Sequence, residues 1–203
     1  MHVVLASSNT GKIAEIKDLL REFDAGLQVS GLADFPHIGP VPEPGETFEA
    51  NALYKAQYVC QRTGLVSLAD DSGLEVDALN GAPGVYSARY SGEQATDEAN
   101  NAKLLKALAG VNDEDRRARF CCVLAAVAPN GEQLILDGTW EGWIATTPRG
   151  EQGFGYDPIF IDKESGRTAA EMSREAKSSR SHRGQALRKL IRLWPEFASR
   201  AAR

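Results

Sequence analysis

The sequence opens with HVVLASSNTGK (residues 2–12), a stretch that predicts a strand, a polar turn and the start of a helix. Residues 2–6 are almost all apolar, whereas residues 7–11 are of the Ser, Asn, Thr and Gly types that favour turns. Beyond the turn, apolar residues recur at helical spacing, at positions 13, 16, 19, 20 and 23. Ser8, Asn9 or Thr10 can cap this helix. A strand that leads directly into a helix favours an α/β fold.

The rest of the chain continues with strand and helix patterns. Apolar runs predict strands over residues 27–32, 66–69, 74–79, 119–128 and 133–136, and amphipathic spacing predicts helices over residues 47–62, 96–109 and from residue 181 onward. The turn Pro129-Asn130-Gly131 predicts a hairpin between the last two strands. We therefore expect an α/β fold with a mixed β-sheet flanked by helices, rather than a strictly doubly wound one. A length of 203 residues suits a single domain over residues 1–203, as one body or as two small lobes.

Composition and charge restrict the class of protein. Apolar residues make up 42% of the chain, and no apolar run reaches the roughly 18 residues that a membrane span needs. The first residues lack the basic and long apolar regions of a signal peptide, so we expect a cytoplasmic chain that does not bind membranes.

The net charge of −5 disfavours a nucleic-acid polymer as partner, although basic residues are concentrated between residues 163 and 192. Cys60, Cys121 and Cys122 suit neither a disulfide framework nor a zinc site.

The polar turn at residues 7–12 is a candidate anion site. The first amides of a helix have no partner within it and lie at its positive end, so phosphate binds there readily. Lys12 adds a mobile positive charge. A Walker A loop is excluded, because Ala6 stands where its first Gly is needed and Ile13 where its Ser or Thr is needed. The alternative is a capped helix start that binds no ligand.

The run Asp70-Asp71-Ser72-Gly73 follows an apolar stretch and is a candidate metal site. Carboxylates at the end of a strand suit Mg²⁺, and one of them can orient or deprotonate a water molecule. Glu43, in the Pro- and Gly-rich loop 34–47, can also reach a metal, and Lys55 lies on the helix that follows. The alternatives are a plain turn at residues 70–73, a solvated acidic loop and a surface lysine.

A second group of candidate residues lies in the C-terminal half of the chain. Gly153-Phe154-Gly155-Tyr156-Asp157-Pro158 can stack its rings on a flat base, with Asp157 free to hydrogen-bond to it. Ser181-His182-Arg183-Gly184, with Lys177 just before it, supplies donors that suit a keto oxygen. The alternatives are a surface turn whose rings pack inward and a solvated basic helix face. The sequence contains no nucleophile elbow and no GxGxxG, so we expect neither a covalent serine mechanism nor a dinucleotide cofactor.

Together these motifs resemble the inosine triphosphate pyrophosphatase family, in its bacterial branch, from about Val3 to Trp194. The motifs stand in the family's order and are widely separated, which makes the resemblance specific. They are ASSNTGK (6–12) with Glu15, Gly45 with Thr47-Phe48, Asn51-Ala52, Lys55-Ala56, ADDSGL (69–74), GAPGVYSARY (81–90), GFGYDP (153–158) and SHR (181–183).

The resemblance implies an elongated fold of two lobes with a central substrate cleft, a homodimer and a requirement for Mg²⁺. It implies hydrolysis of deaminated purine nucleoside triphosphates (ITP, dITP, XTP and dXTP) to the monophosphate and pyrophosphate, which cleanses the nucleotide pool. Asp71 matches the family's general base and metal-linked carboxylate. The positions that we expect at the substrate are Ser7, Ser8, Asn9, Thr10, Gly11, Lys12, Lys55, Ser72, Phe154, Gly155, Tyr156, Asp157, Lys177, His182 and Arg183.

Within that set, roles follow from side-chain chemistry. We expect Lys12, Lys55 and Lys177 to clamp the phosphates. We expect Phe154 and Tyr156 to border the base, and the donors of His182 and Arg183 to favour a 6-keto purine. A 6-amino group would set donor against donor and leave buried polar groups unpaired.

The sequence departs from the family's pattern near the expected metal. Many relatives carry paired acids before the Gly-x-Thr-Phe motif, whereas here Pro42 precedes Glu43; many also carry Glu before Asn-Ala, where this chain has Ala50. We therefore expect Glu43 and Asp71 to hold the metal, with Asp70 nearby. The alternative functions are a Maf-like nucleotide pyrophosphatase that acts on other modified nucleotides, and a non-catalytic nucleotide- or RNA-binding module.

Overall fold

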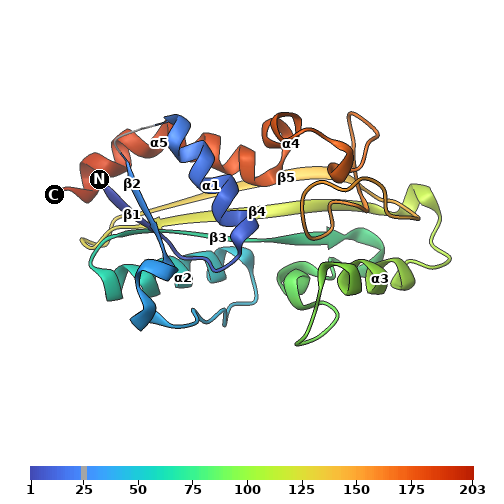
Figure 1. The fold of residues 1–203 in the computed structure, drawn as a ribbon, viewed down its shortest axis with the longest axis horizontal. Coiled ribbons are helices and arrows are strands. Elements are labelled where there is room, and N and C mark those ends of the chain that lie inside the picture. The colour runs from blue at the N-terminus through green and yellow to red at the C-terminus, as the bar shows by residue number, and fades with distance from the viewer. Residues whose placement is uncertain (24–26) are drawn as a thin grey trace. The chain divides into compact units, whose positions relative to one another are not determined.

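The structure, a computed structural model, describes residues 1–23 and 27–203 (Figure 1). Its elements follow one another as β1 (His2–Leu5), α1 (Thr10–Phe23), β2 (Gln28–Gly31), α2 (Phe48–Thr63), β3 (Val66–Val76), α3 (Asp97–Ala107), β4 (Arg117–Val127), β5 (Gln133–Ile144), β6 (Phe160–Asp162), α4 (Arg174–Arg180) and α5 (His182–Ala201). Within these described ranges, no helix combines the length and the apolar character needed to cross a bilayer.

The strands of the described residues form one six-stranded sheet in the order β2-β1-β3-β4-β5-β6. β1 is parallel to β2 and to β3, with Val4 opposite Ser30 and Ser67. β5 and β6 are antiparallel, with Trp143 opposite Ile161. A sheet that contains both strand directions and carries helices is a mixed α/β fold, which confirms the fold class predicted from the sequence.

The chain divides into two compact units. The first comprises residues Met1–Asp71, Cys122–Asp137 and Gln185–Arg203, and the second comprises Ser72–Cys121 and Gly138–Gly184. Because these boundaries fall inside β3, β4 and β5, each of the three strands contributes residues to both units. The predicted site residues are divided in the same way, since Asp71 belongs to the first unit and its neighbour Ser72 to the second.

In the first unit, helices cover the strands on both faces. Val3 and Leu5 of β1 pack in a buried cluster with residues of α1 and α5. Val4 packs in a second cluster with residues of α2. Successive side chains of a strand point to opposite faces, so the buried part of β1, Val3–Leu5, is apolar at every position. Figure 1 shows α1 and α5 on one side of these strands and α2 on the other.

The second unit is built around an aromatic core. Phe120 of β4, Trp140 of β5 and Phe160 of β6 contact one another, with ring centroids 4.6, 4.9 and 6.2 Å apart. Leu74 of β3 and Leu104 of α3 belong to the same buried cluster. Rings at these separations pack in the tilted and offset arrangements that aromatic side chains prefer.

The largest difference from the sequence prediction concerns β3. The sequence predicts a strand that ends at Ala69 and a second strand over residues 74–79, with a plain turn at residues 70–73 as one alternative. The structure has one strand, Val66–Val76, followed by a 3-10 helix at Asp77–Leu79. Two aspartates interrupt the apolar pattern, yet the strand continues through them because lysines from neighbouring helices pair with both carboxylates. β6 and α4 were not predicted, because elements of three and seven residues are too short for a periodic signal.

Gly142 of β5 leaves room for β6. A Cβ atom at this position would collide with the carbonyl oxygen of Ile161 and lie 2.7 Å from Cζ of Phe160. We expect Gly142→Ala to lower the free energy of unfolding by about 1–3 kcal/mol, because overpacking a close contact forces backbone shifts. Urea unfolding followed by tryptophan fluorescence measures this loss. Gly31→Ala is the control, since a Cβ at Gly31 meets no atom within 4 Å, and equal losses in both variants would contradict the prediction.

Candidate functional site

The connection from β1 to α1 forms an ordered turn with exposed polar groups. Asn9 caps α1, because its Oδ1 accepts a hydrogen bond from the backbone N–H of Lys12 at 3.0 Å. The N–H of Asn9 in turn donates to Oγ of Ser7 at 3.2 Å. Ser8 and Thr10 are exposed. Of the three caps that the sequence allows, the structure selects Asn9, and the first turn of α1 faces solvent with the amides and hydroxyls that suit an anion.

Asp70 lies within β3 on the face that packs against α1. It is two residues from Leu68, which belongs to the cluster of α1 and α5, and its Oδ1 lies 2.6 Å from Nζ of Lys12. Its Oδ2 accepts a hydrogen bond from Sγ of Cys122 at 3.2 Å. The Asp70 side chain is fully buried. Leaving such a carboxylate without its ammonium partner would cost several kcal/mol, so this pair is part of the fold.

Asp71 lies on the opposite face of β3, toward α2. It is two residues from Ala69, which packs in the cluster of α2. Lys55 of α2 donates to Oδ1 of Asp71 at 2.8 Å and to Oε1 of Glu43 at 2.7 Å. Lys55 is 6% exposed, so the alternative of a surface lysine is wrong. One ammonium group thus bridges a buried carboxylate and the partly exposed carboxylate of Glu43.

Burial and charge act against each other on this bridge. Burial lowers the pKa of Lys55, but the charges of Asp71 and Glu43 outweigh burial and raise that pKa above the usual value of an amine. Burial raises the pKa of Asp71, and the charges of Lys55 and Lys12 offset only part of this effect. Lys55 therefore keeps its proton, and Asp71 is a more basic carboxylate than an exposed one, which suits it to accept a proton.

The loop that carries Glu43 is fixed by the start of α2. Thr47 caps α2 and accepts a hydrogen bond from the amide of Ala50 at 3.1 Å. The amide of Gly45 donates to Oδ1 of Asn51 at 2.7 Å, and a Cβ at Gly45 would lie 2.8 Å from the same oxygen. Gly45 and Asn51 therefore position the Glu43 loop. The sequence alone did not reveal this role, although both residues stand in the motifs that carry the family resemblance.

In the second unit, the loop of residues 153–158 is folded around Asp157. Oδ2 of Asp157 accepts hydrogen bonds from the amide of Phe154 at 2.9 Å and from Nζ of Lys177 at 2.6 Å. Gly153 has a φ of +84°, and a Cβ there would collide with the Asp157 carboxylate, so only glycine fits. Asp157 is 3% exposed. The structure thus uses this carboxylate to anchor the loop and to hold Lys177, a role that the sequence did not reveal.

The two aromatic residues of this loop have different environments. Phe154 is half-buried, and Nζ of Lys177 lies 5.0 Å from the centre of its ring. Tyr156 is 4% exposed, its hydroxyl donates to the carbonyl oxygen of Ser87 at 2.8 Å, and burial raises its pKa. The ring of Tyr156 is part of the core of the second unit. Phe154 retains a partly exposed ring.

His182 and Arg183 begin α5 and are both buried. The imidazole of His182 stacks on the ring of Phe120, with centroids 4.8 Å apart and planes 10° apart. The Nη2 group of Arg183 donates to Oγ of Ser72 at 2.9 Å, and its Cζ lies 5.9 Å from the centre of the Phe154 ring. The structure therefore places Ser72 and Phe154 beside Arg183 within the second unit, and the solvated-face alternative is wrong for these two basic residues.

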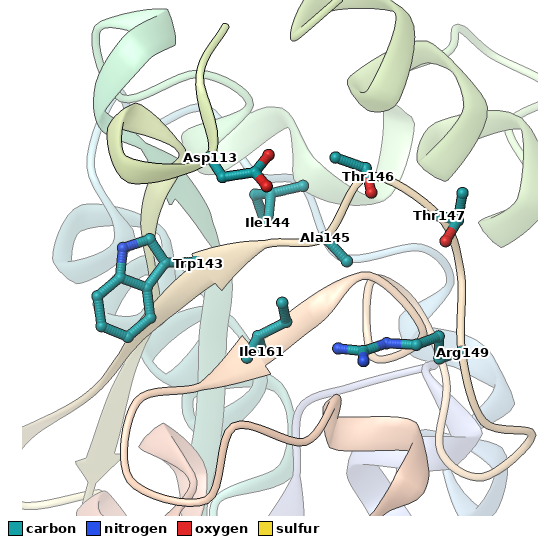
Figure 2. Close-up of a pocket in the computed structure, with 8 residues that line it drawn as sticks. All are labelled: Asp113, Trp143, Ile144, Ala145, Thr146, Thr147, Arg149 and Ile161. Carbon is teal, nitrogen blue, oxygen red and sulfur yellow. The ribbon is translucent and has the colours of Figure 1, made fainter.

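A cavity of about 440 Å³ opens elsewhere in the second unit (Figure 2). Its lining is formed by Asp113, Trp143, Ile144, Ala145, Thr146, Thr147, Arg149 and Ile161. This set includes none of the predicted site residues, so the cavity is not the predicted substrate site. The backbone N–H of Arg149 donates to the carbonyl oxygen of Pro158 at 2.8 Å, so this wall of the cavity supports the end of the 153–158 loop.

The carboxylates of the first unit offer part of a metal site. Among the described residues, no group of three or more His, Cys, Asp or Glu side chains could hold a metal ion. Asp70 and Asp71 lie on opposite faces of β3, because neighbouring residues of a strand alternate, and Asp70 pairs with Lys12. Oδ2 of Asp71 is buried and has no hydrogen-bond partner in the described part of the chain. Glu43 and Asp71 therefore fit a cation that takes its remaining ligands from another molecule.

Comparison with known proteins relates this geometry to a family. The sequence profile of the Ham1 family matches residues 3–193. A Nitratidesulfovibrio vulgaris protein named dITP/XTP pyrophosphatase is 55% identical over 201 residues, which cover 96% of this chain and 96% of that protein. A Streptococcus agalactiae protein of the same name is 50% identical over 196 residues, and the match spans 96% of this chain but 60% of that longer protein.

Solved structures show the same similarity. A HAM1 protein from Coxiella burnetii superposes with a TM-score of 0.88 at 46% identity, with 97% of this chain and 99% of that chain covered. A Mycobacterium abscessus structure described as nucleoside-triphosphatase / dITP/XTP pyrophosphatase gives a TM-score of 0.77 at 48% identity, with 94% and 98% covered. Sequence and fold agree over nearly the whole length of the chain, and the protein belongs to the Ham1 family.

Proposed function

We propose that this chain hydrolyses nucleoside triphosphates of deaminated purines, such as dITP and XTP, to the monophosphate and pyrophosphate. The observation that carries the proposal is the Lys55 bridge, which holds one oxygen of Asp71 and leaves the other buried and available. Such a carboxylate can orient a water molecule or take its proton. The similarity to proteins named dITP/XTP pyrophosphatase supports the substrate class.

Mg²⁺ is the proposed cofactor, with Glu43 and Asp71 as its protein ligands. Mg²⁺ is usually held by one or two carboxylates together with phosphate oxygens of the substrate, which agrees with the incomplete carboxylate set of the first unit. When bound with the substrate, the ion would neutralise charge that develops on the pyrophosphate leaving group. Asp71 directs the attacking water toward the α-phosphorus. Asp70 is not a ligand in this proposal, and it holds Lys12 instead.

The phosphates are bound by residues of the first unit. We assign them to the loop Ser7–Lys12, whose serine and threonine hydroxyls and helix amides suit anionic oxygens, and to the ammonium groups of Lys12 and Lys55. In the structure both lysines are paired with carboxylates, so phosphate binding exchanges or shares those partners. Lys177 belongs instead with Phe154 and Asp157, and we assign it to the base rather than to the phosphates.

The base is recognised by residues of the second unit. The partly exposed ring of Phe154 offers a face for stacking, which is worth about 1–3 kcal/mol for a base. Hydrogen-bond donors near that ring belong to Lys177 and Arg183. His182 directly precedes Arg183 at the start of α5 and supplies a further donor. A purine with a keto oxygen at position 6 accepts from such donors, whereas a 6-amino group leaves donors facing donors.

We propose that residues 1–203 act as one catalytic domain, that two copies form a homodimer, and that the enzyme works in the cytoplasm on free nucleotides rather than on a nucleic-acid polymer. The net charge of −5 supports the exclusion of a polymer, and the three cysteines form no disulfide, which is typical of a reducing compartment.

Hydrolysis of dITP, XTP, dATP and dGTP with Mg²⁺ tests the function. We expect pyrophosphate release from dITP and XTP to exceed that from dATP by at least about tenfold in kcat/KM, because adenine presents a 6-amino donor where these bases present a keto acceptor. A pyrophosphate-coupled assay measures it. If none of these purine nucleotides is hydrolysed but a modified pyrimidine triphosphate added to the panel is, the Maf-like alternative is favoured. RNA binding without turnover of any of them would favour a non-catalytic module.

Asp71→Asn tests the catalytic carboxylate. We expect turnover of dITP to fall by roughly 10²–10⁴-fold while nucleotide binding is partly retained, because an amide cannot accept the proton of water. Steady-state kinetics and isothermal titration calorimetry measure the two effects. Asp137→Asn is the matched control, since Asp137 is exposed and pairs only with the surface residue Lys189 among the contacts described. Near-normal turnover by Asp71→Asn would refute the assigned role.

His182→Ala tests recognition of the base. We expect the preference for dITP over dATP, measured as a ratio of kcat/KM values, to fall roughly tenfold, because one donor to the keto oxygen is lost. Competition assays with both nucleotides give the ratio directly. The control is His37→Ala, which removes an exposed imidazole of the first unit. A ratio that stays at the wild-type value would argue against base recognition by His182.

A further inference from the structure

The imidazole of His182 is oriented by the aromatic core of the second unit. Its ring lies parallel to that of Phe120, with centroids 4.8 Å and planes 10° apart. Both residues are buried, His182 at 6% and Phe120 at 7% exposure. A ring packed face to face in a dense interior has little freedom to tilt. The direction in which His182 presents its nitrogens therefore depends on Phe120.

The same aromatic core also fixes the residues just before His182, through Asp162 and Arg180. Trp140 packs against Phe120 at 6.2 Å, and its indole N–H donates to Oδ1 of Asp162 at 2.7 Å. Oδ2 of Asp162 accepts a hydrogen bond from Nη1 of Arg180 at 2.9 Å. Burial alone would raise the pKa of Asp162, but hydrogen bonds from Ser165 and Trp140 and the charge of Arg180 bring it below its usual value. Asp162 is thus an ionised carboxylate that ties Arg180 to the core.

Arg180 and His182 are the two neighbours of Ser181, where α4 ends and α5 begins. Ser181 is extended, with φ −61° and ψ 153°, and its Oγ accepts a hydrogen bond from the amide of Gly184 at 3.1 Å. α4 carries Lys177, and α5 starts with His182 and Arg183. A contact on each side of this turn fixes the last residue of one helix and the first residue of the next.

We propose that Phe120, Trp140, Asp162 and Arg180 are positioning residues for base selection. They hold the α4–α5 turn from both sides, so that His182 and Arg183 meet the purine 6-position in one orientation. This inference rests on the proposed function, because it concerns the same base-binding residues. Hydrogen-bond donors discriminate only when their direction is fixed, so loosening these contacts lowers the preference for a 6-keto purine more than it lowers turnover.

The first test loosens the stack on His182. We expect Phe120→Leu to lower the dITP-to-dATP ratio of kcat/KM roughly tenfold, since a displaced donor loses its alignment. Phe120→Tyr keeps the ring and should retain the ratio to within about twofold. Phe197→Leu is the matched control, because Phe197 is fully buried in the first unit and the same side-chain change there costs stability without touching this stack.

The second test breaks the tie on the other side of the turn. Arg180 is 35% exposed, so Arg180→Gln is expected to fold even if Phe120→Leu does not. The variant should lower the dITP-to-dATP ratio of kcat/KM by about threefold or more. The cause is that His182 and Arg183 lose their alignment, although Arg180 itself makes no direct contact with the base in this proposal. Glu164→Gln is the matched control, because it neutralises the exposed partner of Arg180 and leaves the bond to Asp162.

A measurement without turnover completes the test. Ring-current shifts of the His182 imidazole protons in the ligand-free protein report the parallel stack directly, and the resonances are assigned by comparison with His182→Ala. We expect these shifts to be lost in Phe120→Leu and kept in Phe197→Leu. If the wild-type protein fails to hydrolyse dITP, the proposed function is refuted. If it prefers dITP while Phe120→Leu and Arg180→Gln leave the ratio unchanged, the positioning role alone is overturned.

Discussion

The first unit depends on one constraint, which is that β3 carries two adjacent aspartates through a buried part of the sheet. Successive strand residues face opposite sides, so Asp70 and Asp71 need separate partners on separate layers. Lys12 of α1 meets Asp70 at 2.6 Å, and Lys55 of α2 meets Asp71 at 2.8 Å. An unpaired buried carboxylate would cost several kcal/mol, so each pair ties a helix to the strand. The pairing of each aspartate with a helix lysine therefore packs α1 and α2 on opposite faces of β3, and it also sets where the charged groups lie.

The two pairs differ in a way that separates structure from chemistry. Asp70 has partners at both oxygens, in Lys12 and Cys122, and its side chain is fully buried. Asp71 has Lys55 at one oxygen only, and its partner lysine is shared with the more exposed Glu43. A carboxylate with a charged or hydrogen-bonding neighbour at each oxygen contributes to stability, whereas a buried oxygen with neither is suited to bind a cation or a water molecule. Their difference in partners follows from which face each residue occupies.

Parts of this arrangement could be predicted from the sequence, and others could not. The strand, turn and helix at residues 2–23 were predictable because apolar spacing is a local property, and the alternation of strands and helices indicated the mixed α/β class. The continuation of β3 through Asp70 was not, because it depends on lysines 58 and 16 residues away from the two acids. The burial of Tyr156 was not predictable for a similar reason. Its partner, the carbonyl oxygen of Ser87, is 69 residues distant, and no local signal tells a buried tyrosine from an exposed one.

By itself, then, the sequence determined the fold class, the family and the residue types that hold charge, because motifs and periodicity are written in neighbouring residues. Only the tertiary structure decided which of those residues share a face. It places Asp70 and Asp71 on opposite faces of β3 and pairs Lys55 with Glu43. It also buries the ring of Tyr156 in the core and stacks His182 on Phe120. The physical reason is that a strand's pleat and long-range packing set the direction of each side chain, and neither is encoded in local spacing.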